Sequence, residues 1–514
     1  MHHGFQQQRI SQTPSYHRGA LLVILIAILL HVSLIWLPGI NLEWVFADGA
    51  KYFESHDPAL LKHYFLLEAN TLGMPFLGSV FHRILPFLDY NAVLRILSAS
   101  SFLLLGYSLL KLHALLERDY NPAVLLAVVF LNPLVWTFGG RGTADLFPAA
   151  LTLLAITLFW QPDSSRLRLA VAITAYGAAI ALKYHAALLL PLVGLEILTR
   201  PGANIRKALL HVGFIVVLIL AIPAFYILLA KRLYGFWLVP PQFRAIHEAN
   251  LNLTSIVMNL IGYAAYLSLL LLPYSLGAIW KRANTTRKAL TTLVAALAVF
   301  FAGAYCVRIG AEMRFGPLDA YINPRIYSGV FLVFAAIFVL LSKEILLDAP
   351  TPSARRYLSC MFAGIIIFVA ILSLTRPAQR YLLFVLPVSY FLVMTRNRSG
   401  KYLTGATILV YAVLILFITL NQVATGRVAE RMVEQIQARG LLSDTEPGKL
   451  IMGTAGNRFP DQVNGVTRKR YTVISGNSPK AIVTVESHPA PLVCKVLSLV
   501  RSEDSPPSTA DDAR

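Results

Sequence analysis

Apolar residues fall into long runs along most of the chain, separated by short polar segments. The runs are about 15–25 residues long, the length that allows a helix to cross a bilayer. We therefore expect an all-α polytopic membrane protein with about thirteen transmembrane helices. The predicted spans lie near residues 20–38, 92–116, 121–138, 145–160, 168–182, 185–199, 208–230, 254–280, 289–306, 328–343, 357–374, 381–395 and 402–421.

Basic residues in the loops test this count, because lysine and arginine are enriched on the cytoplasmic side of a membrane. They are concentrated in alternate loops if the region 168–199 crosses twice, with a break at Lys183. That arrangement predicts a cytoplasmic N-terminus and an extracytoplasmic C-terminus. The predicted inner loops carry Arg166, Arg168, Arg200, Arg206, Lys207, Lys281, Arg282, Arg287, Lys288, Lys343, Arg355, Arg356, Arg396, Arg398 and Lys401.

The first outer loop, 39–91, is too long to be a turn. It contains two amphipathic stretches, near 47–68 and 72–88, in which apolar residues such as Leu77 and Phe81 recur at helical spacing. Such stretches are expected to lie in the plane of the membrane interface.

The predicted domains follow from these changes along the chain. Residues 1–19 are expected to form a cytoplasmic tail, and 20–421 the transmembrane domain. Residues 422–501 combine an amphipathic segment with short strand-like runs, which predicts a small extracytoplasmic α/β appendage. The Ser/Pro/Asp-rich end, 502–514, is expected to be disordered.

Composition supports a membrane protein. The chain is 56% hydrophobic and 14% charged, with a mean hydropathy of +0.63, whereas soluble proteins have about 25% charged residues. The net charge of +19 does not indicate nucleic-acid binding, because the basic residues are spread over many loops rather than one face. The three cysteines are far apart and predict neither a disulfide framework nor a metal site.

Two carboxylates stand in predicted outer loops, where charge near a bilayer requires a reason. Asp48 lies at the start of the first interfacial helix, and Asp145 follows a glycine-rich segment between the third and fourth spans. Either could be a helix N-terminal carboxylate favoured by the helix dipole. Alternatively, the two could meet, since loops after odd-numbered spans open on one face, and Asp48 could then act as a general base.

Basic residues gather at the same predicted face, namely Lys183, Arg244, Arg308, Arg314, Arg325, Arg376 and Arg380. Each could be a snorkelling anchor, but a phosphate-bearing lipid needs cationic donors at the membrane surface. The predicted donor phosphate-binding residues are Arg376, Arg380, Arg244 and Lys183. Arg376 and Arg380 open the twelfth span, where a helix N-terminus adds affinity for an anion.

Other motifs narrow the chemistry further. No histidine shows H-E-x-x-H spacing, so structural zinc is not expected. A loosely held Mg²⁺ or Mn²⁺ could bind at Asp48 and Asp145, with Glu54 or Glu248 as further ligands. Neither a Walker loop nor a dinucleotide fingerprint is present, so a nucleotide-linked substrate has no visible site. Further polar candidates for ligand contacts are Glu54, Arg141, His185 and Tyr381.

Together these features resemble the glycosyltransferase C superfamily, integral-membrane enzymes that use polyprenyl-phosphate-linked sugars. Asp48, in F-A-D-G-A-K-Y, looks like the family's catalytic acidic position, and Asp145, in R-G-T-A-D, like its second acidic position. The run R-Y-L-L-F-V-L-P at 380–387 is similar to its late R-Y-L-L-x-x-L-P helix. The run A-L-K-Y-H-A-A-L-L-L-P at 181–191 is similar to its paired short middle helices. Aminoarabinose transferases and protein O-mannosyltransferases are most similar in architecture.

The resemblance implies a hexosyl- or pentosyltransferase in a bacterial inner (plasma) membrane. It would move a sugar from a polyprenyl-phosphate donor to a lipid, glycan or protein acceptor on the extracytoplasmic face, inverting the anomeric carbon. Membrane lipids are the other implied partner. The sequence departs from the family at Gly49, which replaces a second carboxylate, and at Gly73-Met74-Pro75, where a proline pair is usual. The sugar and the acceptor therefore stay open.

Three other classes stay open beside this one. A transporter or lipid flippase also needs charges within the membrane, but usually shows internal repeats. An O-antigen-type polymerase or ligase also pairs many spans with outer Arg and His, but usually carries its long loop late in the chain. A purely structural scaffold would leave the outward-facing charges without a role.

Overall fold

The computed structural model describes residues 14–34, 44–55, 73–116, 120–161, 165–200, 202, 204–234, 248, 251–277, 285–306, 323–345, 351–375, 377–394, 402–420, 452–453 and 483–484. The chain divides into two units, 1–32 with 45–412, and 33–44 with 413–514. In the second unit, strand β1 (Met452–Gly453) pairs in parallel with β2 (Val483–Thr484). All the interactions analysed below belong to the first unit.

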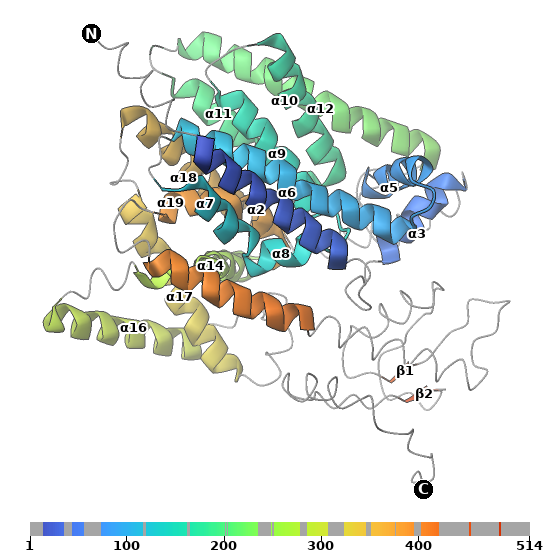
Figure 1. Cartoon of the computed structure of the whole chain (residues 1–514). Helices are drawn as coiled ribbons and strands as arrows, with labels where there is room; N and C mark the ends of the chain where they lie inside the picture. The colour runs from blue at the N-terminus through green and yellow to red at the C-terminus, as the bar shows by residue number, and fades with distance from the viewer. Residues whose placement is uncertain are drawn as a thin grey trace, which may run out of the picture. The chain divides into compact units, whose positions relative to one another are not determined.

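The described part of the first unit is built from helices (Figure 1). Two short 3₁₀ helices, η2 (Tyr184–Leu189) and η5 (Gln379–Phe384), interrupt the α-helical pattern. The α-helices are α2 (Pro14–Ser33), α3 (Trp44–Glu54), α5 (Gly73–Ile84), α6 (Tyr90–Leu115), α7 (Pro122–Phe130), α8 (Pro133–Gly139), α9 (Leu146–Trp160), α10 (Arg166–Leu182), α11 (Leu190–Leu198), α12 (Ile205–Tyr234), α14 (Leu253–Leu270), α16 (Thr286–Cys306), α17 (Pro324–Ile345), α18 (Pro352–Leu372) and α19 (Leu386–Val393). A further helix spans Tyr402–Leu420.

The helices confirm a multi-pass membrane protein. In the described part of the chain, seven helices are long and apolar enough to cross a membrane, or eight if the bent pair α7–α8 is one span. Helical segments occupy each of the thirteen predicted spans, but three are shorter apolar helices, Arg18–Ser33, Leu146–Trp160 and Tyr184–Leu198. The full count of about thirteen therefore stays a prediction.

Several predicted boundaries can be compared with the structure. The helix predicted to begin near residue 20 already begins at Pro14, inside the predicted tail 1–19. The two stretches predicted to be interfacial, 47–68 and 72–88, overlap α3 and α5, and residues 56–68 lie outside the described part of the chain. The predicted appendage 422–501 and the tail 502–514 lie outside the described residues, except for β1 and β2.

Local sequence explains where helices begin. Asn132 accepts a hydrogen bond from the Leu134 N–H at 3.0 Å and precedes Pro133, so it caps α8. The same Asn-Pro pairing starts α7 at Asn121, and Thr351 caps α18 before Pro352. Because proline cannot donate to the preceding turn, these pairs separate one apolar run from the next.

A buried polar cluster holds the 71° bend between α7 and α8. The Asn132 amide donates to the Leu270 carbonyl and to the Tyr390 hydroxyl, both at 2.8 Å. The hydroxyls of Tyr390 and Tyr411 also donate to the Leu270 carbonyl. These bonds satisfy a carbonyl at the C-terminal end of α14, where no intrahelical donor is available.

The helices that carry the site form one packed group. Helix α9 packs against α6 and α10, and α10 packs against α12. The segment formed by η2 and α11 contacts α18, while η5 contacts α9. As a result, the N-terminal end of α9, the C-terminal end of α10 and the 3₁₀ helix η5 meet at one end of the group.

Candidate functional site

The loop between α8 and α9 carries Asp145 and is held from α6. The buried Arg95 side chain of α6 donates from Nε to the Gly140 carbonyl at 2.8 Å. Gly142 has φ +61°, a left-handed conformation that favours glycine. The loop therefore needs both a glycine and a buried arginine to bring Asp145 into position.

The Asp145 carboxylate bonds to another element instead of capping its own helix. Asp145 precedes α9 and is 2% exposed, but its side chain makes no capping hydrogen bond. Lys183 Nζ lies 2.7 Å from Asp145 Oδ1, and Arg380 Nε lies 3.9 Å from the same oxygen. Asp89, by contrast, is a true cap and accepts from the Ala92 N–H at 2.6 Å. Asp145 stands at the N-cap position of α9, but its carboxylate bonds to a cation across the fold rather than to its own helix.

Lys183 and Arg380 come from two helix breaks that share one backbone pattern. Helix α10 ends at Leu182, Lys183 is extended, and the chain continues as η2 and then α11, which has Pro191 in its first turn. Ala378 is extended in the same way before η5 and α19, which has Pro387 in its first turn. The predicted break at Lys183 is confirmed. Each break places one basic side chain near Asp145.

Tyr381 lies beside both cations. The His185 ring stacks on Tyr381, with ring centroids 3.9 Å apart and planes 20° apart. Lys183 Nζ lies 5.4 Å, and the Arg380 guanidinium carbon 5.7 Å, from the Tyr381 ring centroid. Aromatic rings attract cations through their π-face, so Tyr381 helps to fix both charges.

The cluster of Asp145, Lys183 and Arg380 has one negative and two positive charges. The side chains of Asp145 and Lys183 are 3% and 12% exposed, whereas that of Arg380 is 42% exposed. The excess positive charge is thus reached from outside through Arg380. A buried excess of positive charge stabilises an anion, and a guanidinium matches the oxygens of a phosphate group.

Helix α3, which carries Asp48, shares a buried apolar group with the segments that lead into this cluster. Phe46 and Ala47 belong to the same group as Ala144 and Leu182, the residues that precede Asp145 and Lys183. The residues just before Asp48, Asp145 and Lys183 therefore lie in one apolar group. The side chain of Asp48 lies outside the described residues, so its role as a base stays a prediction.

Of the other predicted site residues, Glu54 and Arg141 contact side chains outside the Asp145 cluster. Glu54 accepts from the Tyr90 hydroxyl and lies 3.1 Å from His82 Nδ1, so it joins α3 to α5 and α6. The Arg141 guanidinium carbon lies 5.4 Å from the Phe138 ring centroid. Arg244 and Arg376 lie outside the described residues.

Sequence reasoning missed the contribution of Arg95 and Tyr90. Arg95 could have been found, because an arginine in the middle of an apolar run is costly unless it has a partner. The position of Tyr90 gave no such signal, since tyrosines are common at membrane interfaces.

A divalent ion does not fit well at Asp145. The Lys183 ammonium occupies Oδ1, and Arg380 lies near the same oxygen. Among the residues that the structure describes, no group of three or more His, Cys, Asp and Glu side chains could hold a metal. We therefore derive no step through a metal.

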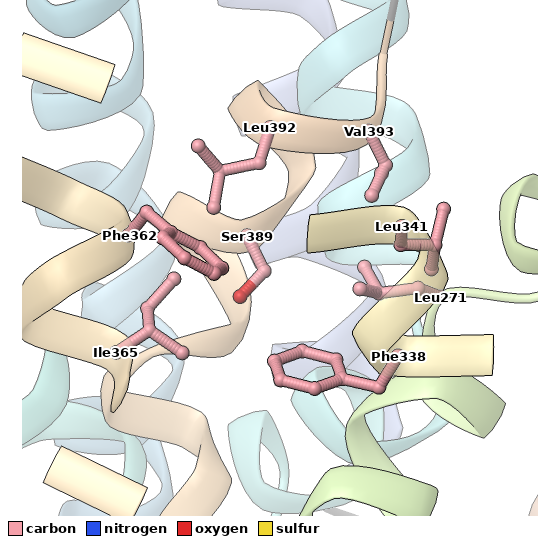
Figure 2. Close-up of a pocket in the computed structure, with 8 residues that line it drawn as sticks. All are labelled: Leu271, Phe338, Leu341, Phe362, Ile365, Ser389, Leu392 and Val393. Atoms are coloured by element: carbon pink, nitrogen blue, oxygen red, sulfur yellow. The ribbon is translucent and has the colours of Figure 1, made fainter. Parts of the chain in front are cut away.

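A pocket between α17, α18 and α19 offers no reactive group. Figure 2 shows Phe338, Phe362 and Leu392 around it, with Ser389 as the one polar lining residue. The Ser389 hydroxyl donates to the Val385 carbonyl at 2.9 Å. That hydroxyl is thus already bonded. None of the described residues that line the pocket is acidic or basic, in contrast to those around Asp145.

Comparison with known proteins finds no matching family model and no matching curated protein. Among solved structures, the chain is similar to apo ArnT from Cupriavidus metallidurans, with 15% identity, a TM-score of 0.41, and coverage of 89% of this chain and 85% of that one. The same enzyme bound to undecaprenyl phosphate gives 16% identity, a TM-score of 0.41, and coverage of 96% and 89%.

An archaeal protein is also similar. The oligosaccharyltransferase AglB from Archaeoglobus fulgidus, in complex with an inhibitory peptide and a dolichol-phosphate, gives 13% identity, a TM-score of 0.39, and coverage of 89% of this chain and 64% of that one. ArnT and AglB are members of the glycosyltransferase C superfamily, whose motifs this sequence resembles.

Proposed function

We propose that this protein is a membrane glycosyltransferase that moves a sugar from a polyprenyl-phosphate donor to an acceptor hydroxyl. One observation carries the proposal: the Asp145–Lys183–Arg380 cluster has excess positive charge, and the residues before Asp145 and Lys183 share a buried apolar group with the helix that bears Asp48. A phosphate headgroup at the membrane surface is an anion of suitable charge, and its lipid chain can stay in the bilayer.

In the proposed reaction, Asp48 accepts the proton of the acceptor hydroxyl. The oxygen attacks the anomeric carbon from the face opposite the phosphate, and the bond between that carbon and the phosphate oxygen breaks. The lipid phosphate leaves with the electron pair. A single displacement needs no enzyme nucleophile and inverts the anomeric carbon.

The basic side chains stabilise the leaving phosphate. Lys183 and Arg380, already held at Asp145, present fixed positive charge where negative charge develops. Asp145 orients these two cations. Further proposed phosphate contacts are Arg376 and Arg244, and proposed sugar or acceptor contacts are Tyr381, His185, Glu54 and Arg141.

The side of the membrane on which the site lies is inferred from the charge of the loops. Because the loops at the opposite helix ends are rich in Lys and Arg, the Asp145 end is assigned to the extracytoplasmic face. The proposed location is a bacterial inner membrane, and the acceptor is a lipid, glycan or protein.

The test compares Asp48→Asn with Asp89→Asn in proteoliposomes that contain polyprenyl-phosphate-linked sugars. Asp48→Asn should lower the transfer rate by about 10²–10⁴ because it removes the general base. Asp89→Asn should leave the rate unchanged, because Asn is also a good helix cap. Glycolipid and glycan products are measured by mass spectrometry, in membranes with and without the protein.

Transfer at the wild-type rate by Asp48→Asn would eliminate the assigned base. Movement of the lipid-linked sugar across the bilayer, with no new glycosidic bond, would instead favour a transporter. Growth of a glycan from lipid-linked repeat units would favour a polymerase.

A further inference from the structure

A second buried ion cluster lies at the C-terminal end of α11. The Glu196 side chain is 2% exposed. Its carboxylate accepts from Arg200 Nη2 at 2.7 Å and from Arg356 Nη2 at 3.4 Å. As at Asp145, one carboxylate faces two guanidinium or ammonium groups, which leaves an excess positive charge.

This cluster lies at the other end of the helices from Asp145. Helix α9 begins directly after Asp145 and ends at Trp160, and its 15 residues span about 22 Å. Tyr357, the neighbour of Arg356 on α18, donates from its hydroxyl to the Trp160 carbonyl at 3.3 Å. The cluster around Glu196 is therefore separated from the Asp145 site by about the length of α9 and is not part of it.

Buried donors on Arg356 and at the end of α9, which Tyr357 contacts, have no partner in the described part of the chain. They are Arg356 Nε and Nη1, Trp160 Nε1 and Gln161 Nε2. The Gln161 amide oxygen already accepts from Arg168 Nη1 at 3.3 Å, so its NH₂ group remains as the donor. Buried polar groups normally find a partner, and such exceptions often mark an unseen water or ion.

Tyr357 contacts both Arg356 and Trp160. The Arg356 guanidinium carbon lies 4.6 Å from the Tyr357 ring centroid, and the Trp160 and Tyr357 ring centroids are 5.3 Å apart. Trp160 is 1% exposed, so its indole N–H is held within the fold. Indole and guanidinium groups donate and cannot accept. The missing partner is thus an acceptor, and the excess positive charge favours an anionic one.

We propose that this cluster binds a phosphate group, taken from the headgroup of an anionic phospholipid or from free phosphate. Arg356 Nε and Nη1 would donate to it, supported by Trp160 Nε1 and Gln161 Nε2. Phosphate suits the site because it accepts several charge-assisted hydrogen bonds at once. The site is independent of the proposed glycosyl transfer, since it shares no residue with the Asp145 cluster.

The experiment uses the full chain in phosphatidylcholine nanodiscs and measures the thermal unfolding temperature, which rises when the folded state binds a ligand. One arm adds inorganic phosphate against chloride at equal ionic strength. The other replaces part of the lipid with phosphatidylglycerol. A rise with both probes indicates a site for the phosphate group in general, and a rise with phosphatidylglycerol alone indicates a lipid headgroup.

Arg356→Gln should weaken the apparent affinity about tenfold to a hundredfold, because it removes charge-assisted bonds. Arg355→Gln is the matched control, because it removes the same charge from an exposed position one residue earlier. Arg355→Gln should bind as the wild type does. Equal weakening in both variants would mean non-specific surface attraction and would overturn the site.

Trp160→Phe keeps an aromatic ring and removes the N–H donor, so it provides the test if Arg356→Gln does not fold. It should weaken the affinity several-fold. If neither probe stabilises the wild type, or if Trp160→Phe and Arg356→Gln both bind as tightly as the wild type, the cluster is a structural ion pair only.

Discussion

Removal of the Lys183 charge should leave Asp145 as a poorly compensated buried carboxylate. Lys183→Met keeps the length of the side chain and removes the ammonium that lies 2.7 Å from Asp145 Oδ1. Asp145 is only 2% exposed, so water cannot replace the lost partner. We expect this variant to be strongly destabilised and to bind a phosphate headgroup weakly.

The size of the effect follows from burial. Breaking a buried ion pair by removing one partner costs about 3–5 kcal/mol. Arg380 remains 3.9 Å from the same oxygen, so we expect the lower end, about 3 kcal/mol. The variant with both Lys183→Met and Asp145→Asn should recover part of this loss, because no buried charge is then left alone. The coupling energy between the two substitutions should be about 2 kcal/mol.

Reversible unfolding in mixed micelles, followed by tryptophan fluorescence as the fraction of denaturing detergent rises, measures these differences. Lys207→Met is the control, because Lys207 is exposed and should change stability by less than about 0.5 kcal/mol. If Lys183→Met is as stable as Lys207→Met, or if the two substitutions at Lys183 and Asp145 are additive, the pair does not hold the site as we argue.

Two further predictions concern the loop and the aromatic pair. Gly142→Ala should lower stability by about 2 kcal/mol, because φ is +61° and a Cβ would lie 3.1 Å from the Leu94 Cβ. Gly202→Ala, at φ +73° with nothing within 4 Å, tests the backbone strain alone; equal losses in both would contradict the contact argument. Tyr381→Phe should keep the stack on His185 and its stability, whereas Tyr381→Ala should lose about 0.5–1.5 kcal/mol. Unfolding curves of both Tyr381 variants measure this, and equal losses would show that the hydroxyl, not the ring, stabilises the pair.

Patterns along the chain predicted the helices well because their causes are local. An apolar run buries itself in the bilayer wherever it occurs, and Asn132-Pro133 ends one helix and starts another through bonds within a few residues. The break at Lys183 also has a local cause, since the chain leaves α10 there and Pro191 begins the next helix.

Charged residues were identified from the sequence, but their partners were not. Lys183 and Arg380 were identified as cations at the membrane surface, and both lie near Asp145. Glu54, a predicted contact for sugar or acceptor, bonds to Tyr90 and His82, and its role in binding stays a prediction. For Asp48 and Asp145 the sequence offered two interpretations, because a carboxylate at a helix start can be favoured by the helix dipole or bond to another segment.

The amino-acid sequence by itself determined that this is a helical membrane protein with charged residues held at the ends of its spans. Only the tertiary structure decided which charges from distant segments are paired: Asp145 with Lys183 and Arg380 at one end, and Glu196 with Arg356 at the other. The physical reason is the distance along the chain between the groups that interact. Apolar burial and helix capping depend on neighbours along the chain, whereas a buried charge is stable only when an opposite charge from another segment reaches it.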